Sequence, residues 1–211
     1  MRTRILSTEQ IQRTIDVFNH DRTLPMIIIG SAAIQLHMYD RMKVLTVEPG
    51  LDVLCGLGAI DALASKAALM DANAMHTVRG DQAGGHTFLK LRPSEALVRS
   101  GILPMNAYTG FGDGQYDIAF EDALKTARFD IQTGLPKLPL ADVIDWKLSL
   151  ENWTVDDRPQ IQDALDVATI DGDLTAEQIA QFDERLRQKS HRVRFSREIA
   201  HDDYSDWRSA L

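Results

Sequence analysis

The sequence predicts a mixed α/β fold followed by a helical C-terminal part. Short apolar runs typical of buried strands, at residues 26–29 and 51–54, alternate with segments of helical periodicity in the first two thirds of the chain. From Ala141 onward the sequence shows helical patterns only. We therefore expect an α/β domain over residues 1–140, with a helical part over residues 141–211 packed on it.

The composition supports a folded domain and argues against one class of partner. Hydrophobic residues make up 44% of the 211 residues, which is enough for a substantial core. The 23 Lys and Arg residues are outnumbered by 31 Asp and Glu residues, giving a net charge of -8. Because nucleic-acid binding draws on a basic surface, this balance argues against a general nucleic-acid coat but not against a small local basic site.

The single cysteine, Cys55, excludes an intrachain disulfide and fits a reducing compartment. It lies in an apolar run, so we interpret it as a small buried hydrophobe rather than a nucleophile. Residues 1–4 lead into a polar helix rather than an apolar signal region, and no apolar run approaches the roughly 20 residues of a membrane span. We expect a soluble cytoplasmic protein.

The N-terminal third contains clear helix and strand signals. Ser7 and Gln10 form a capping-box pattern that starts a helix, and the helix ends before Pro25. The β-branched run Met26–Ile29 predicts a buried strand. A turn at Gly30 and Ser31 then leads into a helix that reaches His37, and residues 51–54 predict the next strand.

The remaining elements follow from weaker local patterns. In the middle of the chain we expect a helix over 59–72, strands over 74–78 and 86–91, a helical turn at 93–98, a loop at 110–114, a strand over 116–120 and extended chain at 135–139. Three helices follow, over 142–150, 161–170 and 176–188, the last capped by Thr175. Trp146 and Trp153 are expected to pack this helical part. The basic residues Arg192, Arg194 and Arg197 are interpreted as a solvated helix end, with contact to RNA or an acidic partner as the alternative.

The dipeptide Gly30-Ser31 is a candidate phosphate site. A turn between a buried strand and a helix leaves backbone N–H groups at the helix start, and such groups bind phosphate oxygens. Glycine lets the ligand approach the backbone, and the serine hydroxyl adds a contact. An ordinary capping turn has the same sequence pattern, so both interpretations stay open.

Asp52 and Asp117 are candidate metal ligands. Each lies among apolar residues of a predicted strand, where a carboxylate is expected at a sheet edge, paired, or bound to a cation. Two such carboxylates on neighbouring strands would share Mg²⁺ and orient a nucleoside triphosphate. The alternative is that strand alternation points each side chain to solvent.

Taken in order, these segments resemble the nucleotidyltransferase superfamily, in particular the AbiEii-like toxins and related uncharacterised bacterial proteins. The shared order is strand, Gly-Ser, helix, acidic strand and a later acidic strand. Residues 138–148 and 158–164 look like two later segments of that family, a Leu-Pro segment with its helical lysine and an arginine segment. The resemblance covers roughly residues 10–170.

The resemblance implies a mixed sheet flanked by helices and a specific set of roles. Gly30 and Ser31 would hold a triphosphate, and Lys147 would face a phosphate. Asp52 would be the second acid of a metal-binding pair, and Asp117 would be the third acid, which activates the attacking hydroxyl. The reaction would be Mg²⁺-dependent transfer of a nucleotide to a hydroxyl on RNA, protein or a small molecule.

The sequence also departs from the family pattern at several positions. Gly50 stands where the first acid is expected, and Val47 and Glu48 stand where an arginine and a threonine are common. The lysine and aspartate of the later arginine segment fall on Gln160 and Ile161. Glu48 would serve as a substitute metal ligand, and the alternative is that the Pro49-Gly50 turn places it away from the site. The alternative function is a catalytically inactive protein of this fold that binds a nucleotide or a partner such as a cognate antitoxin.

Overall fold

A computed structural model describes residues 4–38, 45–46, 49–70, 73–112, 117–149, 157–171 and 174–190. Among these residues, seven strands form a mixed sheet in the order β10-β11-β2-β4-β7-β6-β5, and two short ribbons pair β1 with β3 and β8 with β9. The sheet strands are β2 (Met26–Ile29), β4 (Leu51–Cys55), β5 (Met75–Asp81), β6 (Thr87–Pro93), β7 (Met105–Tyr108), β10 (Arg128–Asp130) and β11 (Leu135–Lys137). The ribbons are β1 (Arg4–Ile5), β3 (Leu45–Thr46), β8 (Gly110–Gly112) and β9 (Asp117–Ala119). Within the sheet, β11 with β2 and β4 with β7 are parallel pairs, and the other pairs are antiparallel.

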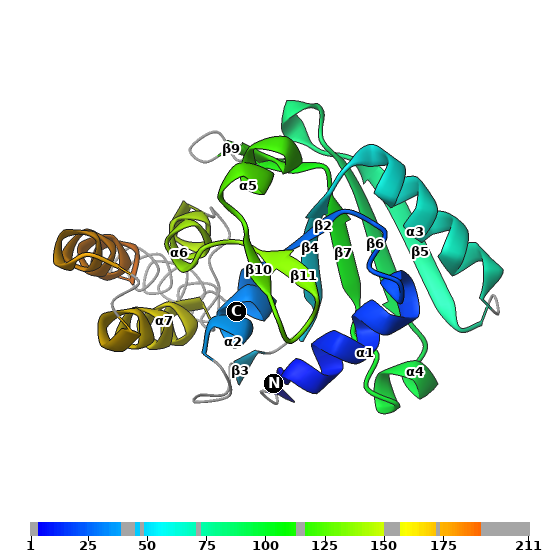
Figure 1. Ribbon diagram of the computed structural model, residues 1–211, viewed down its shortest axis with the longest axis horizontal. Coiled ribbons are helices and arrows are strands. Elements are labelled where there is room, and N and C mark those ends of the chain that lie inside the picture. The colour runs from blue at the N-terminus through cyan, green and yellow to red at the C-terminus, as the bar shows by residue number, and fades with distance from the viewer. Residues whose placement is uncertain are drawn as a thin grey trace, which may run out of the picture.

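Helices lie on both sides of this sheet (Figure 1). They are α1 (Thr8–Asn19), α2 (Gly30–His37), α3 (Leu57–Leu69), α4 (Glu95–Arg99), α5 (Phe120–Thr126), α6 (Leu140–Ser149), α7 (Asp157–Asp171) and a helix over residues 176–190. On one side α1 and α3 are neighbours, joined where Lys66 Nζ donates to the carbonyl oxygen of Phe18 at 2.9 Å. On the other side α6 packs against both α2 and α7. The predicted mixed α/β fold is confirmed.

Two predicted helix starts are confirmed at the level of single hydrogen bonds. Ser7 Oγ accepts from the Gln10 N–H at 3.2 Å, and Gln10 Oε1 accepts from the Ser7 N–H at 3.2 Å. Thr175 and Gln178 exchange the same pair of bonds, at 3.2 and 2.9 Å, at the start of the helix over residues 176–190. Both are capping boxes, in which each side chain satisfies a backbone N–H that the helix leaves without a partner.

The three neighbouring strands β4, β7 and β6 have an apolar face and a polar face. Alternate side chains on these strands are fully buried on one face: Leu51, Val53, Met105, Ala107, Leu89 and Leu91. The side chains between them are partly exposed, and we call this set the polar face: Asp52, Asn106, Tyr108, Lys90 and Arg92. Because strand side chains alternate with a period of two, a polar residue within an apolar strand marks the second face.

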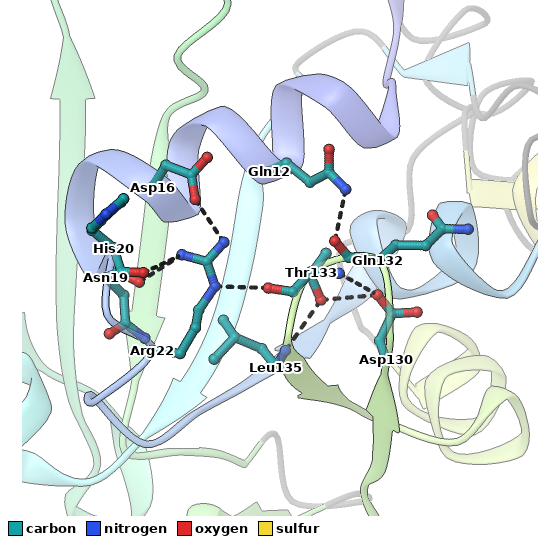
Figure 2. A network of polar contacts seen from close by, with 9 residues as sticks. All are labelled: Gln12, Asp16, Asn19, His20, Arg22, Asp130, Gln132, Thr133 and Leu135. Carbon is teal, nitrogen blue, oxygen red and sulfur yellow. Dashed lines mark hydrogen bonds and ion pairs between the residues drawn. The ribbon is translucent and has the colours of Figure 1, made fainter.

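A network of polar contacts ties α1 to the turn between the edge strand β10 and its neighbour β11 (Figure 2). Arg22 Nε donates to the carbonyl oxygen of Thr133 at 2.8 Å, and its Nη2 donates to Asp16 Oδ1 at 2.6 Å. Gln12 Nε2 donates to the carbonyl oxygen of Gln132 at 2.7 Å. Since β11 pairs with β2, this network fixes the edge of the sheet beside the strand that ends at Gly30.

A buried ion pair reinforces the same corner. Lys137 Nζ lies 3.0 Å from Asp130 Oδ1, and both side chains are almost completely buried. The same ammonium donates to the carbonyl oxygen of Leu36 at 3.0 Å. The other carboxylate oxygen, Asp130 Oδ2, accepts from the Thr133 N–H and hydroxyl at 2.9 Å. The pair therefore joins the β10–β11 hairpin to the last turn of α2.

Several predicted boundaries are wrong. The helix predicted over 59–72 is α3, which begins earlier, at Leu57, and ends earlier, at Leu69; the predicted loop at 110–114 contains β8, and Phe120 begins α5 rather than ending a strand. Strand β7, in the centre of the sheet, has no counterpart among the predicted elements. Residues 39–44, Trp153 and the basic residues 192, 194 and 197 lie outside the described residues.

Cys55 is a buried strand residue, as predicted. It is fully buried at the end of β4, and burial raises the pKa of its thiol to about 12. A thiol with that pKa is protonated at neutral pH, so this cysteine is a small apolar core residue. In the part of the chain that the structure describes, no helix has the length and apolar character needed to cross a membrane.

Candidate functional site

The site is built around Gly30, where β2 ends and α2 begins. Its φ is +65°, in the left-handed region that favours glycine. A Cβ at this position would lie 2.9 Å from Asp52 Oδ2 and 3.2 Å from Trp146 Cζ3. Glycine is therefore required for two reasons, its backbone conformation and the close approach of β4 and α6. Strand pairing of Ile29 with Asp52 brings the carboxylate to this turn.

The start of α2 carries the features expected of a phosphate-binding turn. Its N-cap residue, Ile29, makes no side-chain capping bond, so the first-turn N–H groups have no acceptor from that side chain. Ser31 Oγ donates to Gln160 Oε1 at 2.7 Å, which joins α2 to α7. Gln160, one of the departures from the family pattern, is thus a positioning partner of Ser31.

Asp52 is held by a chain of hydrogen bonds that crosses three strands. Asn106 Nδ2 donates to Asp52 Oδ1 at 2.6 Å, and Arg92 Nη1 donates to Asn106 Oδ1 at 3.0 Å. The strand register places Asp52, Asn106 and Lys90 in one row across β4, β7 and β6. Neighbouring strands are about 4.8 Å apart, so the row spans about 10 Å of backbone.

The electrostatic setting of Asp52 combines burial with surrounding positive charge. Burial raises the pKa of the Asp52 carboxyl above its ordinary value of 3.8. The hydrogen bond from Asn106 and the charges of Lys147, Arg92 and Lys90 act in the opposite direction and lower it. Burial is the larger effect. The Asp52 carboxylate is thus partly desolvated and is surrounded by the positive charges of Lys147, Arg92 and Lys90.

Aromatic side chains line the same region. The rings of Tyr108 and Phe111 meet edge to face with centroids 5.4 Å apart, and those of Phe111 and Trp146 do the same at 5.2 Å. Burial, and then the negative charge of Asp52, raise the pKa of Tyr108. The indole Nε1–H of Trp146 is buried and has no hydrogen-bond partner among the described residues. Trp146, expected to pack the helical part, also contacts the turn at Gly30.

Four of the predicted site residues lie in this region. Gly30 contacts Asp52, Ser31 is the next residue of α2, and Lys147 of α6 acts electrostatically on Asp52 while its own side chain is buried. Their predicted roles, phosphate binding for Gly30, Ser31 and Lys147 and metal binding and catalysis for Asp52, stay predictions.

Asp117 and Glu48 are placed differently. We expected Asp117 on a strand next to that of Asp52, and this arrangement is wrong, because β9 pairs with β8 in a separate ribbon. The strand beside β4 is β7, where Asn106 faces Asp52. The side chain of Asp117 and the whole of Glu48 lie outside the described residues, so their roles as metal ligands stay predictions.

The described residues do not by themselves fit a magnesium centre. They contain no group of three or more His, Cys, Asp or Glu side chains arranged to hold a metal ion. At the row of polar residues they supply one carboxylate, Asp52, and an amide whose nitrogen points at that carboxylate. Mg²⁺ takes oxygen ligands in an octahedral arrangement, and an N–H donor opposes it.

Comparison with known proteins supports the fold. No protein-family model and no curated protein matches the sequence. One solved structure that matches is the antibiotic-resistance factor ANT(2'')-Ia, an aminoglycoside nucleotidyltransferase, whose solution structure reveals substrate-regulated conformation dynamics. The two chains share 11% sequence identity with a TM-score of 0.51, over 92% of this chain and 97% of that chain. The similarity concerns the fold, which is nucleotidyltransferase-like as predicted. The finer resemblance to AbiEii-like toxins gains no support from it and stays a prediction.

Proposed function

We propose that this chain is a nucleotide-binding protein of the nucleotidyltransferase-like fold that receives the triphosphate of a nucleotide at the start of α2. The observation that carries the proposal is the left-handed Gly30 at the start of α2, where the N-cap residue Ile29 makes no side-chain capping bond, placed against Asp52 and within the field of Lys147. A helix start of this kind offers backbone N–H groups and a partial positive charge to an anion.

The same site supports binding more strongly than transfer. Nucleotide transfer depends on neutralising the charge that develops on the phosphoryl oxygens, and this fold class is expected to use acids that hold metal ions for that purpose. Gly50 replaces one expected acid, and Asn106 faces Asp52 from the neighbouring strand. The described residues therefore hold a nucleotide without supplying the carboxylates that transfer requires.

Binding is tested by thermal unfolding of the pure protein with ATP, GTP, CTP or UTP. A ligand at about one hundred times its Kd stabilises the folded state by about 2.7 kcal/mol, which raises the Tm of a chain of this size by about 5–10 °C. Replacing Ser31→Asp places a negative charge in the phosphate turn but suits a helix start, so it should abolish the rise in Tm without unfolding the protein.

A matched control is available at another helix start. Ser94→Asp makes the same change at the N-cap of α4, where Ser94 Oγ accepts from the Leu97 N–H. This variant should retain the full nucleotide-induced rise in Tm. If none of the four nucleotides raises the Tm of the wild-type protein, the binding proposal fails.

A second candidate is Mg²⁺-dependent transfer of a nucleotide to a hydroxyl acceptor. What favours it is the nucleotidyltransferase-like fold together with the position of Asp52 at the Gly30 turn. It requires the side chains of Asp117 and Glu48 to complete the metal site. The test is incubation with labelled nucleoside triphosphates, Mg²⁺ or Mn²⁺, and cell extract, beside an Asp52→Ala variant. Label transfer by the wild type alone would establish it and would also identify the acceptor as RNA, protein or a small molecule. A cognate antitoxin as partner is a prediction of the AbiEii resemblance.

A further inference from the structure

We propose that the site neutralises the phosphates of its nucleotide with Lys147, Arg92 and Lys90 of the protein itself, so that nucleotide binding needs no divalent cation. This inference rests on the proposed nucleotide-binding function and specifies how that site works. The resemblance to the nucleotidyltransferase superfamily implies several acids that hold metal ions. Among the described residues, the side chains around Asp52 are an amide and cations instead.

The β7 side of the Asp52 carboxylate is occupied by an N–H donor. Asn106 Nδ2 donates to Asp52 Oδ1 at 2.6 Å, so an N–H group occupies the side of the carboxylate that faces β7. A metal ion shared between β4 and β7 would need oxygen ligands from both strands at this place. The amide oxygen of Asn106 is turned toward Arg92 instead, at 3.0 Å from Nη1. The donor set between the two strands is therefore that of a hydrogen bond, not of a metal centre.

Positively charged side chains surround the Asp52 carboxylate. The cations that act on Asp52 are Lys147, Arg92 and Lys90, whereas the row itself contributes one carboxylate. On the polar face, the two positive charges of Lys90 and Arg92 exceed the one negative charge of Asp52, and this balance favours an anion over a divalent cation. In a partly desolvated place this preference is stronger than it would be in water, because the surrounding dielectric constant is lower.

Two of these cations are accessible to a ligand on the polar face of the sheet. Lys90 and Arg92 are partly exposed on the polar face, with the Lys90 ammonium 5.2 Å from the centroid of the Phe88 ring. Arg92 is oriented by its bond to Asn106. Lys147 approaches Asp52 from α6, on the same helix as Trp146, which contacts Gly30. The cations thus come from the sheet and from α6, the two parts of the fold that meet the Gly30 turn through Asp52 and Trp146.

The decisive experiment measures the affinity of the full-length protein for ATP and for inorganic triphosphate, once with EDTA and once with Mg²⁺. Equal or tighter binding in EDTA supports the inference. Binding that requires Mg²⁺ overturns it while leaving the proposed nucleotide-binding function intact. Binding in neither condition overturns both. The inorganic triphosphate distinguishes capture of the phosphates from capture of the nucleoside.

Variants give a second, opposite-signed test. Asp52→Asn removes the negative charge that competes with the phosphates, so it should tighten ATP binding in EDTA by about fivefold. If Asp52 holds a metal, the same variant should instead abolish binding. Arg92→Gln and Lys90→Gln should each weaken binding by about tenfold, whereas Arg99→Gln on the exposed surface of α4 should leave it unchanged.

A gain-of-function variant completes the design. Asn106→Asp places a second carboxylate against Asp52, where like charges require a cation or a proton between them. ATP binding by this variant should become dependent on Mg²⁺ or Mn²⁺. If Asn106→Asp and the wild type respond to EDTA identically, position 106 does not decide the metal requirement and the inference fails.

Discussion

Replacing Gly30 by alanine adds one methyl group at the point where β2 ends and α2 begins. The backbone there has a φ of +65°, and the added Cβ would lie 2.9 Å from Asp52 Oδ2 and 3.2 Å from Trp146 Cζ3. The Asp52 carboxylate cannot turn away freely, because its other oxygen accepts a 2.6 Å hydrogen bond from Asn106. The substitution therefore strains the backbone and disturbs the centre of the site together.

The expected loss of stability follows from these two effects. A non-glycine residue in the left-handed region costs about 1–2 kcal/mol. Displacing the Asp52 carboxylate, or forcing it or Trp146 off its preferred rotamer, costs about 1 kcal/mol more. A total of about 2–3 kcal/mol lowers the Tm of a chain of this size by about 4–12 °C.

Urea and thermal denaturation measure this loss, and Gly58→Ala is the matched control. Gly58 lies in α3, where an added Cβ meets nothing within 4 Å. Alanine in a helix is favoured over glycine by about 0.5–1 kcal/mol, so this control should be as stable as the wild type or slightly more stable. A Gly30→Ala protein that unfolds at the same urea concentration as the control would refute the close approach of β4 to the α2 start.

Three further predictions concern groups around the site and its supporting corner. Lys137→Met should destabilise the protein by about 3–5 kcal/mol because it leaves Asp130 charged and buried, and adding Asp130→Leu should recover most of that loss; a double variant no more stable than the single one in urea contradicts this. Asn106→Leu should cost about 1–3 kcal/mol in the same assay, because Asp52 Oδ1 loses its donor and Arg92 loses an acceptor. The raised pKa of Asp52 means that the folded state binds more protons than the unfolded state above pH 3.8, so this group's contribution to stability falls as pH rises through its folded pKa. Asp52→Asn should lack that fall, and urea titrations at several pH values should show the variant gaining stability relative to the wild type as the pH increases.

The sequence was sufficient for elements whose signals are local. Met26–Ile29 is a run of four apolar residues ending at a glycine, and Ser7 with Gln10 is a capping pattern, so both were predicted correctly. The same holds for the turn at Gly30, since glycine after a β-branched run indicates a special backbone conformation. The position of Gly30 beside Asp52 could also be predicted from the sequence, because it requires only that the two predicted strands pair.

Strand β7 could not be predicted in the same way, and with it Asn106 was missed. The strand has four residues, Met105–Tyr108, and it is held in place by pairing with β4 and β6, which are distant in sequence. The available signal was the alternation of buried Met105 and Ala107 with partly exposed Asn106 and Tyr108. The sequence pattern favoured Asp117 instead, because it is an acid among apolar residues. Its strand, however, pairs with β8 outside the main sheet.

The residue at position 106 contacts both Asp52 and Arg92, so its side chain affects the chemistry of the candidate site. An asparagine donates from its amide nitrogen to Asp52 and accepts at its amide oxygen from Arg92, and both bonds are present. An aspartate at this position would keep the bond to Arg92, but its second oxygen would stand 2.6 Å from Asp52 Oδ1, a distance at which two carboxylates cannot both stay charged unless a cation lies between them. A leucine would serve neither neighbour. In the metal-independent site that we propose, the amide keeps the Asp52–Arg92 connection without a metal ion, and an anionic ligand faces Lys90 and Arg92 of the polar face. Similarity of fold does not distinguish asparagine from aspartate at position 106, because either residue is compatible with the same strands, register and Gly30 turn.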